Sequence, residues 1–400
     1  MLDGEYGEGY EIAMSVLAKL GDIYGADRML RIENVHIDGA AYGWINDSGL
    51  ELIEKLASSG ACFRVPATLN PSSIDFDMWQ ELKIPSCVAN KQLRLANALK
   101  RMGGIPTWTC APYQCGADLR FGQNVAWGES NAVGFANTVV GARTERLGDL
   151  ADMCAAVVGE YPRFGLYLDE NRRGQMLFEV DKVGMESFSS MDYGVLGFHV
   201  GSVAGAGVPV VSGMPRKVSN DELKSFCAAA AVGGSVALCH LCGITPEAKT
   251  IAEAFHSSAP EEKITIEAGD LEYTRQKLST GYEEQAEAVC IGCPHCSVQE
   301  LVQIARLIKG RKVDRNVRFL VFTSRAAKAL TREMGIVENI EASGARVIAD
   351  TCWNFVPLEA KILMTDSVKM AWTSLSKFTS VALGSVERCI DVAVEAKQLG

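Results

Sequence analysis

The chain has 400 residues, of which 22% are charged and 48% hydrophobic, and its formal net charge is −10. This composition is typical of a folded globular protein, and the length predicts two or three domains because single cores stop growing near ~250–300 residues. The acidic balance argues against a nucleic-acid or anionic-membrane surface, where basic patches are needed.

Export and membrane insertion also find no support in the sequence. No uninterrupted apolar run approaches the ~20 residues needed to cross a bilayer, and the acidic start MLDGEYGEGYE is unlike the basic end of a signal peptide. The 13 cysteines, an odd number scattered along the chain, do not resemble a secreted disulfide framework. We therefore expect a cytoplasmic protein whose cysteines are mostly thiols or metal ligands.

The first part of the chain alternates between helical and strand-like patterns. Helices are predicted at Tyr10–Leu20, Gly49–Ala57 and Cys87–Arg101, and strands at Met29–Ile37, at Cys62–Leu69 and around Ile105–Cys110. The turn at Asp38-Gly39 and the stop at Asn70-Pro71 separate these elements. The alternation predicts an α/β fold.

The middle of the chain is rich in glycine and has few clear periods. Trp127–Gly141 (WGESNAVGFANTVVG) is predicted to be a helix, and Tyr167–Gly174 a strand that ends in charged residues. The polar residues of the first segment are Glu129, Ser130, Asn131 and Asn137. Polar residues at the ends of elements are typical of a site, although helix capping and solvation explain the same residues.

The last 120 residues show the clearest pattern. Strands are predicted at Ala286–Ile291, Arg318–Thr323, Ala345–Ala349 and Lys361–Met364, with helices at Val298–Lys309 and Arg325–Met334. This order predicts a βαβ domain with a parallel sheet. We expect a segment 1–60, a central α/β substrate region 61–280 and a C-terminal domain 281–400. Cys293 and Cys352 each follow a strand, and ligands collect beyond the carboxyl ends of parallel strands, so these thiols are expected to be neighbours.

Three cysteines lie in short turns that are far apart in the chain. Cys110 is in WTCAPY, Cys293 in IGCPHCS and Cys352 in ADTCWN. The pattern indicates an iron or iron–sulfur centre, because thiolates hold such centres and a cluster with three thiolates leaves one iron open as a Lewis acid. The alternative is that each is a buried loop thiol, since free cysteine is common in cores.

Other motifs leave further alternatives open. Four thiolates from Cys239, Cys242, Cys293 and Cys296 are a second way to hold a metal, in this case zinc. Among the histidines, His295, His36 and His240 are candidates for ligands or proton carriers, or are histidines satisfied by nearby loops. The sequence contains no glycine-rich phosphate loop and no G-x-S-x-G elbow, which removes the support for a nucleotide-binding protein or a serine hydrolase.

A set of segments along nearly the whole chain resembles the aconitase X family. The segments are, in order, MLDGEYGE, RVPATLNP, TCAPY, FGQNVAWGESNAVGFANTVVGARTER, LYLDENRRG, ITPEA, IGCPHCS and ADTCW. The resemblance implies an aconitase-like, multi-domain α/β/α architecture and a hydro-lyase. It also implies that Cys110, Cys293 and Cys352 hold a four-iron or two-iron cluster or a mononuclear iron.

The same motifs suggest roles for polar residues. Glu129, Ser130 and His36 are the candidates for catalysis, and the candidates for substrate binding are Asn131, Arg143, Thr144, Asp169, Asn171 and Arg172. A dehydration needs a polarised hydroxyl, a base for the α-proton and cations for the substrate's carboxylate or phosphate. Arg143 and Arg172 are the candidates for the last task.

Aconitases also use a mobile swivelling domain, which in this family is either fused or made as a small separate subunit. The chain reaches Gly400 directly after a predicted helix (VERCIDVAVEAKQLG), so the resemblance implies a heteromer with a small swivel-domain subunit. Two activities are associated with the family, dehydration of cis-3-hydroxy-L-proline and of mevalonate 5-phosphate. We favour the first, because Asp366, where relatives often carry Asn, would repel a phosphate. A non-catalytic zinc-binding or thiol-based scaffold or redox sensor is the alternative of another class.

Overall fold

The computed structural model describes residues 1–180, 183–215 and 217–394. The chain divides into two compact units, Met1–Arg173 with Asp350–Pro357, and Gly174–Ala349 with Leu358–Gly400. None of the helices in the described ranges combines the length and the apolar character that a bilayer span requires.

The first unit is built on a parallel sheet of three short strands in the order β3-β2-β4. Its helices are α1 (Glu8–Tyr24), α2 (Tyr42–Ser58), α3 (Ser86–Arg101), α4 (Ser130–Phe135) and α5 (Ala151–Val158), and its strands are β1 (Met29–Arg31), β2 (Val35–Ile37), β3 (Ala67–Leu69), β4 (Ala126–Trp127) and β5 (Glu160–Pro162). β1 pairs with β5 in a separate antiparallel ladder.

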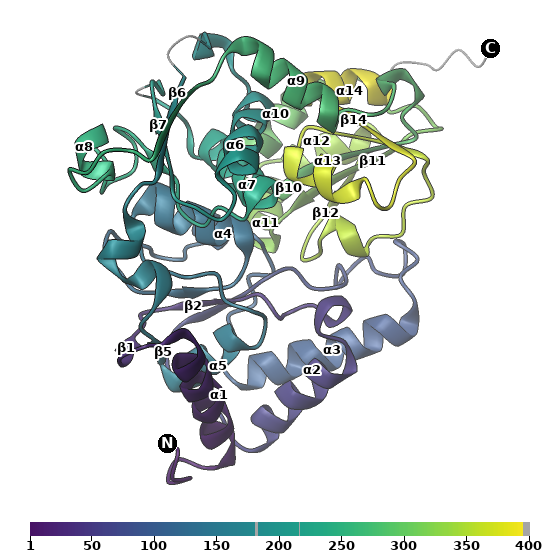
Figure 1. Ribbon diagram of the computed structural model, residues 1–400. Helices are drawn as coiled ribbons and strands as arrows, with labels where there is room; N and C mark the ends of the chain where they lie inside the picture. Colours follow the sequence, from purple (N-terminus) through teal and green to yellow (C-terminus); the bar gives the residue numbers. More distant parts are fainter. Residues whose placement is uncertain (181–182, 216, 395–400) are drawn as a thin grey trace. The chain divides into compact units, whose positions relative to one another are not determined.

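The helices of the first unit cover the sheet through apolar faces at helical spacing. In α1, Ala13 and Leu17 are four residues apart and fully buried, and in α2 Leu50 and Ile53 play the same role. α2 and α3 lie side by side (Figure 1). The central strand β2 is buried at every residue, including the polar His36.

The second unit contains two parallel sheets, β12-β11-β10-β13-β14 and β8-β7-β6-β9. Its strands are β6 (Met176–Glu179), β7 (Pro209–Ser212), β8 (His240–Leu241), β9 (Glu262–Thr265), β10 (Ala288–Cys296), β11 (Arg318–Thr323), β12 (Arg346–Ile348), β13 (Ile362–Thr365) and β14 (Ser380–Leu383). Its helices are α6 (Ser190–Ala204), α7 (Asn220–Gly234), α8 (Ile251–Ala254), α9 (Ala268–Leu278), α10 (Val298–Ile308), α11 (Arg325–Glu333), α12 (Ile336–Ala342), α13 (Val368–Ser374) and α14 (Val386–Val394).

The five-stranded sheet has a continuous apolar core on the side of α10, α12 and α14. Leu301 and Ile304 of α10 and Ile340 of α12 are fully buried in the same cluster as Val289 and Val321 of the sheet. In α10 the buried residues recur at helical spacing and form one apolar face, which is why the sequence predicted this helix. These residues are Leu301, Ile304, Ala305 and Ile308.

The helix pair α6 and α7 packs at very close range (Figure 1). Methyl groups added at Gly197 and Gly201 of α6 would overlap the backbone carbonyl oxygens of Phe226 and Ala230 on α7. Most of α6 is buried, including Val195, which removes the usual contrast between an apolar and a polar face.

A buried charge cluster connects the start of α7 to the end of β10. The side chain of Lys224, 2% exposed, pairs with Glu300 and, at 3.2 Å, with Asp221. Its Nζ also donates to the carbonyl oxygen of His295 at 3.3 Å, and Ser297 Oγ donates to Asp221 Oδ2 at 2.8 Å. A buried charge needs such partners, so this cluster fixes the turn Cys293–Ser297 against α7.

The expected α/β class with a parallel C-terminal sheet is confirmed. Arg318–Thr323 is a strand with the predicted bounds, and the other predicted elements of this region differ by a few residues at their ends. The terminal helix is present as Val386–Val394, and residues 395–400 lie outside the described residues.

Two of the predicted strands are wrong. The segment Ile105–Cys110 forms only an isolated bridge, between Thr68 and Ile105, because Pro106 has no amide hydrogen to continue a ladder. The segment Tyr167–Gly174 is not a strand but lies in 3₁₀ turns at Gly165–Tyr167 and Asp169–Arg172. Its polar residues come one after another behind the buried Tyr167 and do not alternate with apolar residues, as they would in a strand. The predicted helix Trp127–Gly141 begins only at Ser130, after strand β4, and continues as a π-helical turn at Ala136–Val140.

Candidate functional site

The Cys110 loop is held at the end of strand β3. The backbone amide of Thr109 donates to the carbonyl oxygen of Leu69, the last residue of β3, at 3.1 Å. Asn131 Nδ2 donates to the carbonyl oxygen of Cys110 at 2.5 Å. Cys110 itself is partly exposed, so the backbone of the loop is fixed at a residue that is not fully buried.

The Cys352 loop is attached to the same segment, three residues further along the chain. The amide of Ser72 donates to the carbonyl oxygen of Asp350 at 2.7 Å, and Thr351 Oγ1 donates to the carbonyl oxygen of Ser72 at 2.9 Å. Cys352 is also partly exposed. Leu69 and Ser72 therefore anchor two thiol-bearing loops that are more than two hundred residues apart in sequence.

Cys293 belongs to the second unit and lies near the end of β10. Gly292, with φ 101°, precedes it, and a side chain at this glycine would meet the carbonyl oxygen of Phe322. Ser367 Oγ donates to the carbonyl oxygen of Cys293. In all three loops, a backbone carbonyl oxygen of the cysteine or of a nearby residue accepts a hydrogen bond. In all three, the cysteine is partly exposed.

The neighbouring cysteines of the same motif are in a different environment. Cys290 and Cys296 are buried, and burial raises the pKa of Cys290 to about 12 and that of Cys296 well above the usual value. Near neutral pH these thiols remain protonated, which suits packing and not metal binding.

Glu129 organises the residues around the Cys110 loop. It caps helix α4, where its Oε2 accepts from the amide of Ala132 at 2.8 Å and from Asn131 Nδ2 at 2.6 Å. Ser130 Oγ donates to its other carboxylate oxygen at 3.2 Å. On the far side of Asn131, Tyr113 Oη donates to Asn131 Oδ1 at 2.6 Å. Three predicted site residues, Glu129, Ser130 and Asn131, thus form one network with the backbone of Cys110.

His36 lies under this network and is fully buried. Its Nδ1 is 2.8 Å from Thr68 Oγ1 and its Nε2 is 3.2 Å from Asn70 Oδ1. Burial lowers the pKa of His36 to about 4, although the Glu129 carboxylate opposes this shift. The ring is therefore neutral near pH 7, and a neutral imidazole here orients Asn70 and Thr68 and does not exchange protons readily.

Arg172 and Thr144 form a separate buried cluster around Asn137. Arg172 is 1% exposed, and its guanidinium donates to Asn137 Oδ1 at 3.0 Å and to the carbonyl oxygens of Leu166 and Ala142. Thr144 Oγ1 accepts from the amide of Trp127 at 3.0 Å, and its backbone bonds to the side chain of Asn137.

The remaining predicted residues lie in the turns Gly165–Arg172 and nearby. Arg143 pairs with Asp169 and donates to the carbonyl oxygen of Tyr167 at 3.1 Å. Asn171 is exposed and donates to the carbonyl oxygen of Gly165 at 2.9 Å. The structure therefore divides the predicted polar residues into a group around Cys110 and a group around Asn137 and Arg143.

Several residues of the first group were not predicted. Tyr113, Thr68, Asn70 and Asp38 all contribute hydrogen bonds, and Asn70 Nδ2 donates to Asp38 Oδ1. Asp152, fully buried, accepts from the amide of Asp38 at 2.6 Å, and burial raises its pKa to about 7. The signals in the sequence were the segment RVPATLNP for Thr68 and Asn70, the segment TCAPY for Tyr113 and the turn at Asp38-Gly39 for Asp38. Asp152 had no such signal.

Across residues 1–180, 183–215 and 217–394, no three side chains of His, Cys, Asp or Glu form a group that could hold a metal ion. The ligand set Cys110, Cys293 and Cys352 and the zinc alternative with Cys239, Cys242, Cys293 and Cys296 both stay predictions. Of the latter residues, Cys239 is buried, and burial raises its pKa well above the usual value.

Comparison with known proteins gives a consistent result. The first, second and third domains of aconitase X match residues 1–170, 174–276 and 286–395. The phosphomevalonate dehydratase large subunit of Methanocaldococcus jannaschii is 39% identical, over 98% of this chain and 97% of that protein. The cis-3-hydroxy-L-proline dehydratase of Pseudomonas aeruginosa is 35% identical, over 98% of this chain and 68% of that protein.

A solved structure agrees with the sequence matches. The crystal structure of Thermococcus kodakaraensis aconitase X in its holo-form is 36% identical, with a TM-score of 0.87, over 98% of this chain and 97% of that chain. The related enzymes are dehydratases, that is, hydro-lyases, which confirms the reaction class expected from the resemblance. Because three domain models match in order and the relatives align along nearly the whole chain, the chain belongs to the aconitase X family.

Proposed function

We propose that this chain is the large subunit of a dehydratase that removes water from a small hydroxy acid at an iron or iron–sulfur centre held by Cys110, Cys293 and Cys352. The observation that carries the proposal is the attachment of the Cys110 and Cys352 loops to the same segment after β3. These cysteines are partly exposed, whereas Cys290 and Cys296 are buried, and partial exposure suits a thiol that acts as a ligand. Thiolates are the usual ligands of iron–sulfur clusters.

The roles of the polar residues follow from their hydrogen bonds. When bound, an iron with an open coordination position would polarise the departing hydroxyl as a Lewis acid. Glu129 and Asn131 hold the backbone of the Cys110 loop in place, and Ser130 is oriented by Glu129. His36, neutral and buried, orients Asn70 beneath them. The base that takes the α-proton is expected on the partner subunit.

Substrate binding is proposed for the second group of residues. Arg143, which is partly exposed and pairs with the exposed carboxylate of Asp169, can exchange that partner for a substrate anion. The guanidinium of Arg172 instead donates hydrogen bonds to backbone carbonyl oxygens and to Asn137. We therefore propose that Arg172 positions the turns that carry Arg143 and Asn171. Thr144 supports the same turns through Asn137.

For the substrate we propose cis-3-hydroxy-L-proline. Asp366 follows β13 and precedes Ser367, whose hydroxyl is bonded to the Cys293 carbonyl, so an acidic group lies next to this turn. One of its carboxylate oxygens is buried without a hydrogen-bond partner in the described part of the chain, and burial raises its pKa to about 7. In its ionised form, which the raised pKa leaves only partly populated near pH 7, this side chain disfavours a phosphate dianion.

The second candidate substrate is mevalonate 5-phosphate. It is favoured by the higher identity to the large subunit from Methanocaldococcus jannaschii, 39% against 35% for the hydroxyproline enzyme. That relative is named a large subunit, which supports a small-subunit partner for this chain as well. We propose that this partner is a swivel-domain protein and that the enzyme works in the cytoplasm, where cysteines stay reduced.

The test is anaerobic purification of the chain together with its small subunit, followed by measurement of iron, sulfide and visible absorption. We expect Cys110→Ser, Cys293→Ser and Cys352→Ser each to remove the centre, while Cys115→Ser and Cys296→Ser retain it. Both candidate substrates are then assayed with the wild-type complex.

Two results would contradict the proposal. Retention of the centre in all three ligand variants would show that the ligands are elsewhere. A colourless protein that contains only zinc would favour the scaffold or redox-sensor alternative.

A further inference from the structure

Helix α7 packs against strand β10 (Figure 1), and Lys224 of α7 reaches the end of that strand. Its Nζ donates to the carbonyl oxygen of His295 at 3.3 Å and pairs with Asp221 at 3.2 Å and with Glu300. The side chain is 2% exposed, so its ammonium charge is surrounded by protein and not by water. His295 comes two residues after Cys293, one of the three cysteines that we propose as iron ligands.

The two carboxylates of this cluster also hold the residue that ends the turn Cys293–Ser297. The amide of Ser297 donates to Glu300 Oε2 at 2.7 Å, and Ser297 Oγ donates to Asp221 Oδ2 at 2.8 Å. The turn is therefore bonded to the cluster through His295 and through Ser297. The charges of the cluster are thus held at a fixed place relative to this turn.

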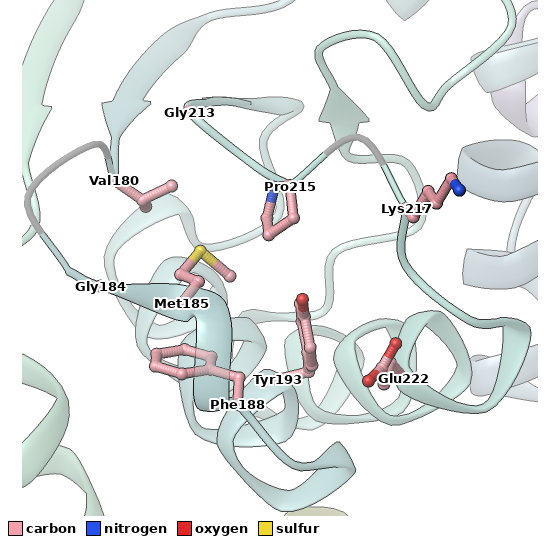
Figure 2. A pocket seen from close by; sticks show the side chains of 9 residues that line it. All are labelled: Val180, Gly184, Met185, Phe188, Tyr193, Gly213, Pro215, Lys217 and Glu222. Atoms are coloured by element: carbon pink, nitrogen blue, oxygen red, sulfur yellow. The ribbon is translucent and has the colours of Figure 1, made fainter.

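The carboxylate of Glu222, the next residue after Asp221, has a different role. Its Oε2 accepts from the amide of Ser219 at 2.6 Å, where it helps to cap α7. Figure 2 shows Glu222 with Tyr193 and Lys217 at the wall of a separate cavity. We therefore define the Lys224 cluster by Lys224, Asp221 and Glu300.

Stability alone does not account for such a cluster. Apolar residues of the same volume often stabilise a fold as well as a buried ion pair does, or better. The electrostatic effect of Lys224 on neighbouring groups is larger, because burial weakens the screening of its charge.

The next strand end shows this effect. Burial, and to a lesser degree the Glu300 carboxylate, raises the pKa of Asp366 to about 7, and the charge of Lys224 opposes this rise. Asp366 precedes Ser367, whose hydroxyl donates to the carbonyl oxygen of Cys293. The charge of Lys224 therefore acts on groups at both attachments of the Cys293 turn.

The size of the effect at Cys293 follows from the length of the turn. Two residues of chain span at most about 7 Å, so the Lys224 ammonium lies within roughly 13 Å of the Cys293 backbone. At an effective dielectric constant of about 20, a unit charge at this distance changes an equilibrium about tenfold. The reduction potential of an iron centre depends on nearby charges and hydrogen bonds in this way.

We propose that the Lys224 cluster sets the reduction potential of the iron centre at Cys293, with Lys224 raising the potential and Asp221 lowering it. The inference rests on the proposed function. In the couple concerned the centre gains one electron, and no bond of the chain forms or breaks. The added electron makes the centre more negative, so the ammonium stabilises the reduced form and the carboxylate destabilises it.

The test is a potentiometric titration of the two-subunit complex, purified anaerobically, with dithionite as the electron donor and visible absorption as the readout. We expect Lys224→Met to shift the potential to a more negative value. A tenfold change in the ratio of oxidised to reduced centre corresponds to about 59 mV for a one-electron couple. Lys224→Arg retains the charge and should stay near the wild-type potential.

Asp221→Asn tests the opposite sign. The asparagine removes one negative charge and retains an oxygen that can accept from Ser297, so the potential should shift to a more positive value. The shift should be smaller than for Lys224→Met, because the Asp221 side chain is 20% exposed. Lys263→Met, at an exposed lysine on β9, is the matched control and should not shift the potential.

Opposite shifts for the two variants support the proposal, because a change in the structure of the turn does not follow the sign of the removed charge. Shifts in the same direction, or potentials equal to that of Lys263→Met, would overturn it. Asp221→Asn decides the question if Lys224→Met does not retain its centre. A wild-type complex without iron would contradict the proposed function as well, whereas a centre with unchanged potentials would contradict this inference alone.

Discussion

Individual polar residues around the Cys110 loop are buried and mutually bonded, and His36 is the clearest example. The ring is fully buried between Thr68 and Asn70, and its pKa is lowered to about 4 because burial disfavours the charged form. In the unfolded chain the same ring has a pKa near 6.5. His36 therefore makes a contribution to the free energy of unfolding that depends on pH.

Between pH 6.5 and pH 4 the unfolded chain binds a proton at His36 that the folded chain does not bind. The contribution of this residue to the free energy of unfolding is present above pH 6.5 and is lost as the pH falls, by up to about 3 kcal/mol in total. His36→Asn removes this titration. We expect the variant to be less stable than wild type at pH 7.5, with a difference that shrinks between pH 6.5 and pH 4.

Urea denaturation of both proteins at several pH values measures this difference. His256→Asn, at an exposed histidine after α8, is the control and should keep the same difference from wild type at every pH. A stability gap for His36→Asn that does not vary with pH would show that the ring is not held in its neutral form.

At the level of elements, the sequence predicted well an amphipathic helix, α10, and a strand that is a continuous apolar run, β11. α10 and β11 were recognised because their apolar residues follow a simple period or run. α6 and α7 were missed because α6 is buried on nearly all sides, so no period distinguishes a core face. Their packing depends on small residues, whose importance becomes visible only when the two helices are placed together.

The glycines of this helix pair give a second prediction. Gly197→Ala would place a methyl group against the Phe226 carbonyl, and helix backbones cannot shift without disturbing the rest of the pair. We expect a loss of about 2–3 kcal/mol in the free energy of unfolding, typical of overpacking. Guanidinium denaturation provides the measurement.

Gly269→Ala is the matched control for this prediction. Gly269 also lies in a helix, α9, but nothing surrounds its position within 4 Å. Because alanine is the better helix former, this variant should be equal to wild type or more stable by up to about 1 kcal/mol. A similar effect of the two substitutions would mean that the close approach of α6 and α7 does not limit stability.

At the level of the whole molecule, the family relation leads to a prediction about activity. If a small swivel-domain subunit supplies the base, the chain alone with its centre reconstituted should turn over substrate at least about a hundredfold more slowly than the two-subunit enzyme, because the reacting groups are not positioned together. The measurement is a dehydration assay of the chain with and without the co-purified small subunit. Equal rates would place the complete catalytic machinery on this chain.

The sequence by itself determined the α/β class, the parallel C-terminal sheet and the three cysteine turns, because these depend on local periodicity and on short motifs. Only the tertiary structure decided which loops are attached to the segment after β3. The segment after β12 that carries Cys352 belongs with the first unit, where Ser72 anchors it and Leu69 anchors the Cys110 loop. It also decided that Arg172 is buried against carbonyl oxygens and that Tyr193 lines a cavity. Such facts depend on contacts between residues distant in the chain, which spacing along the sequence does not encode.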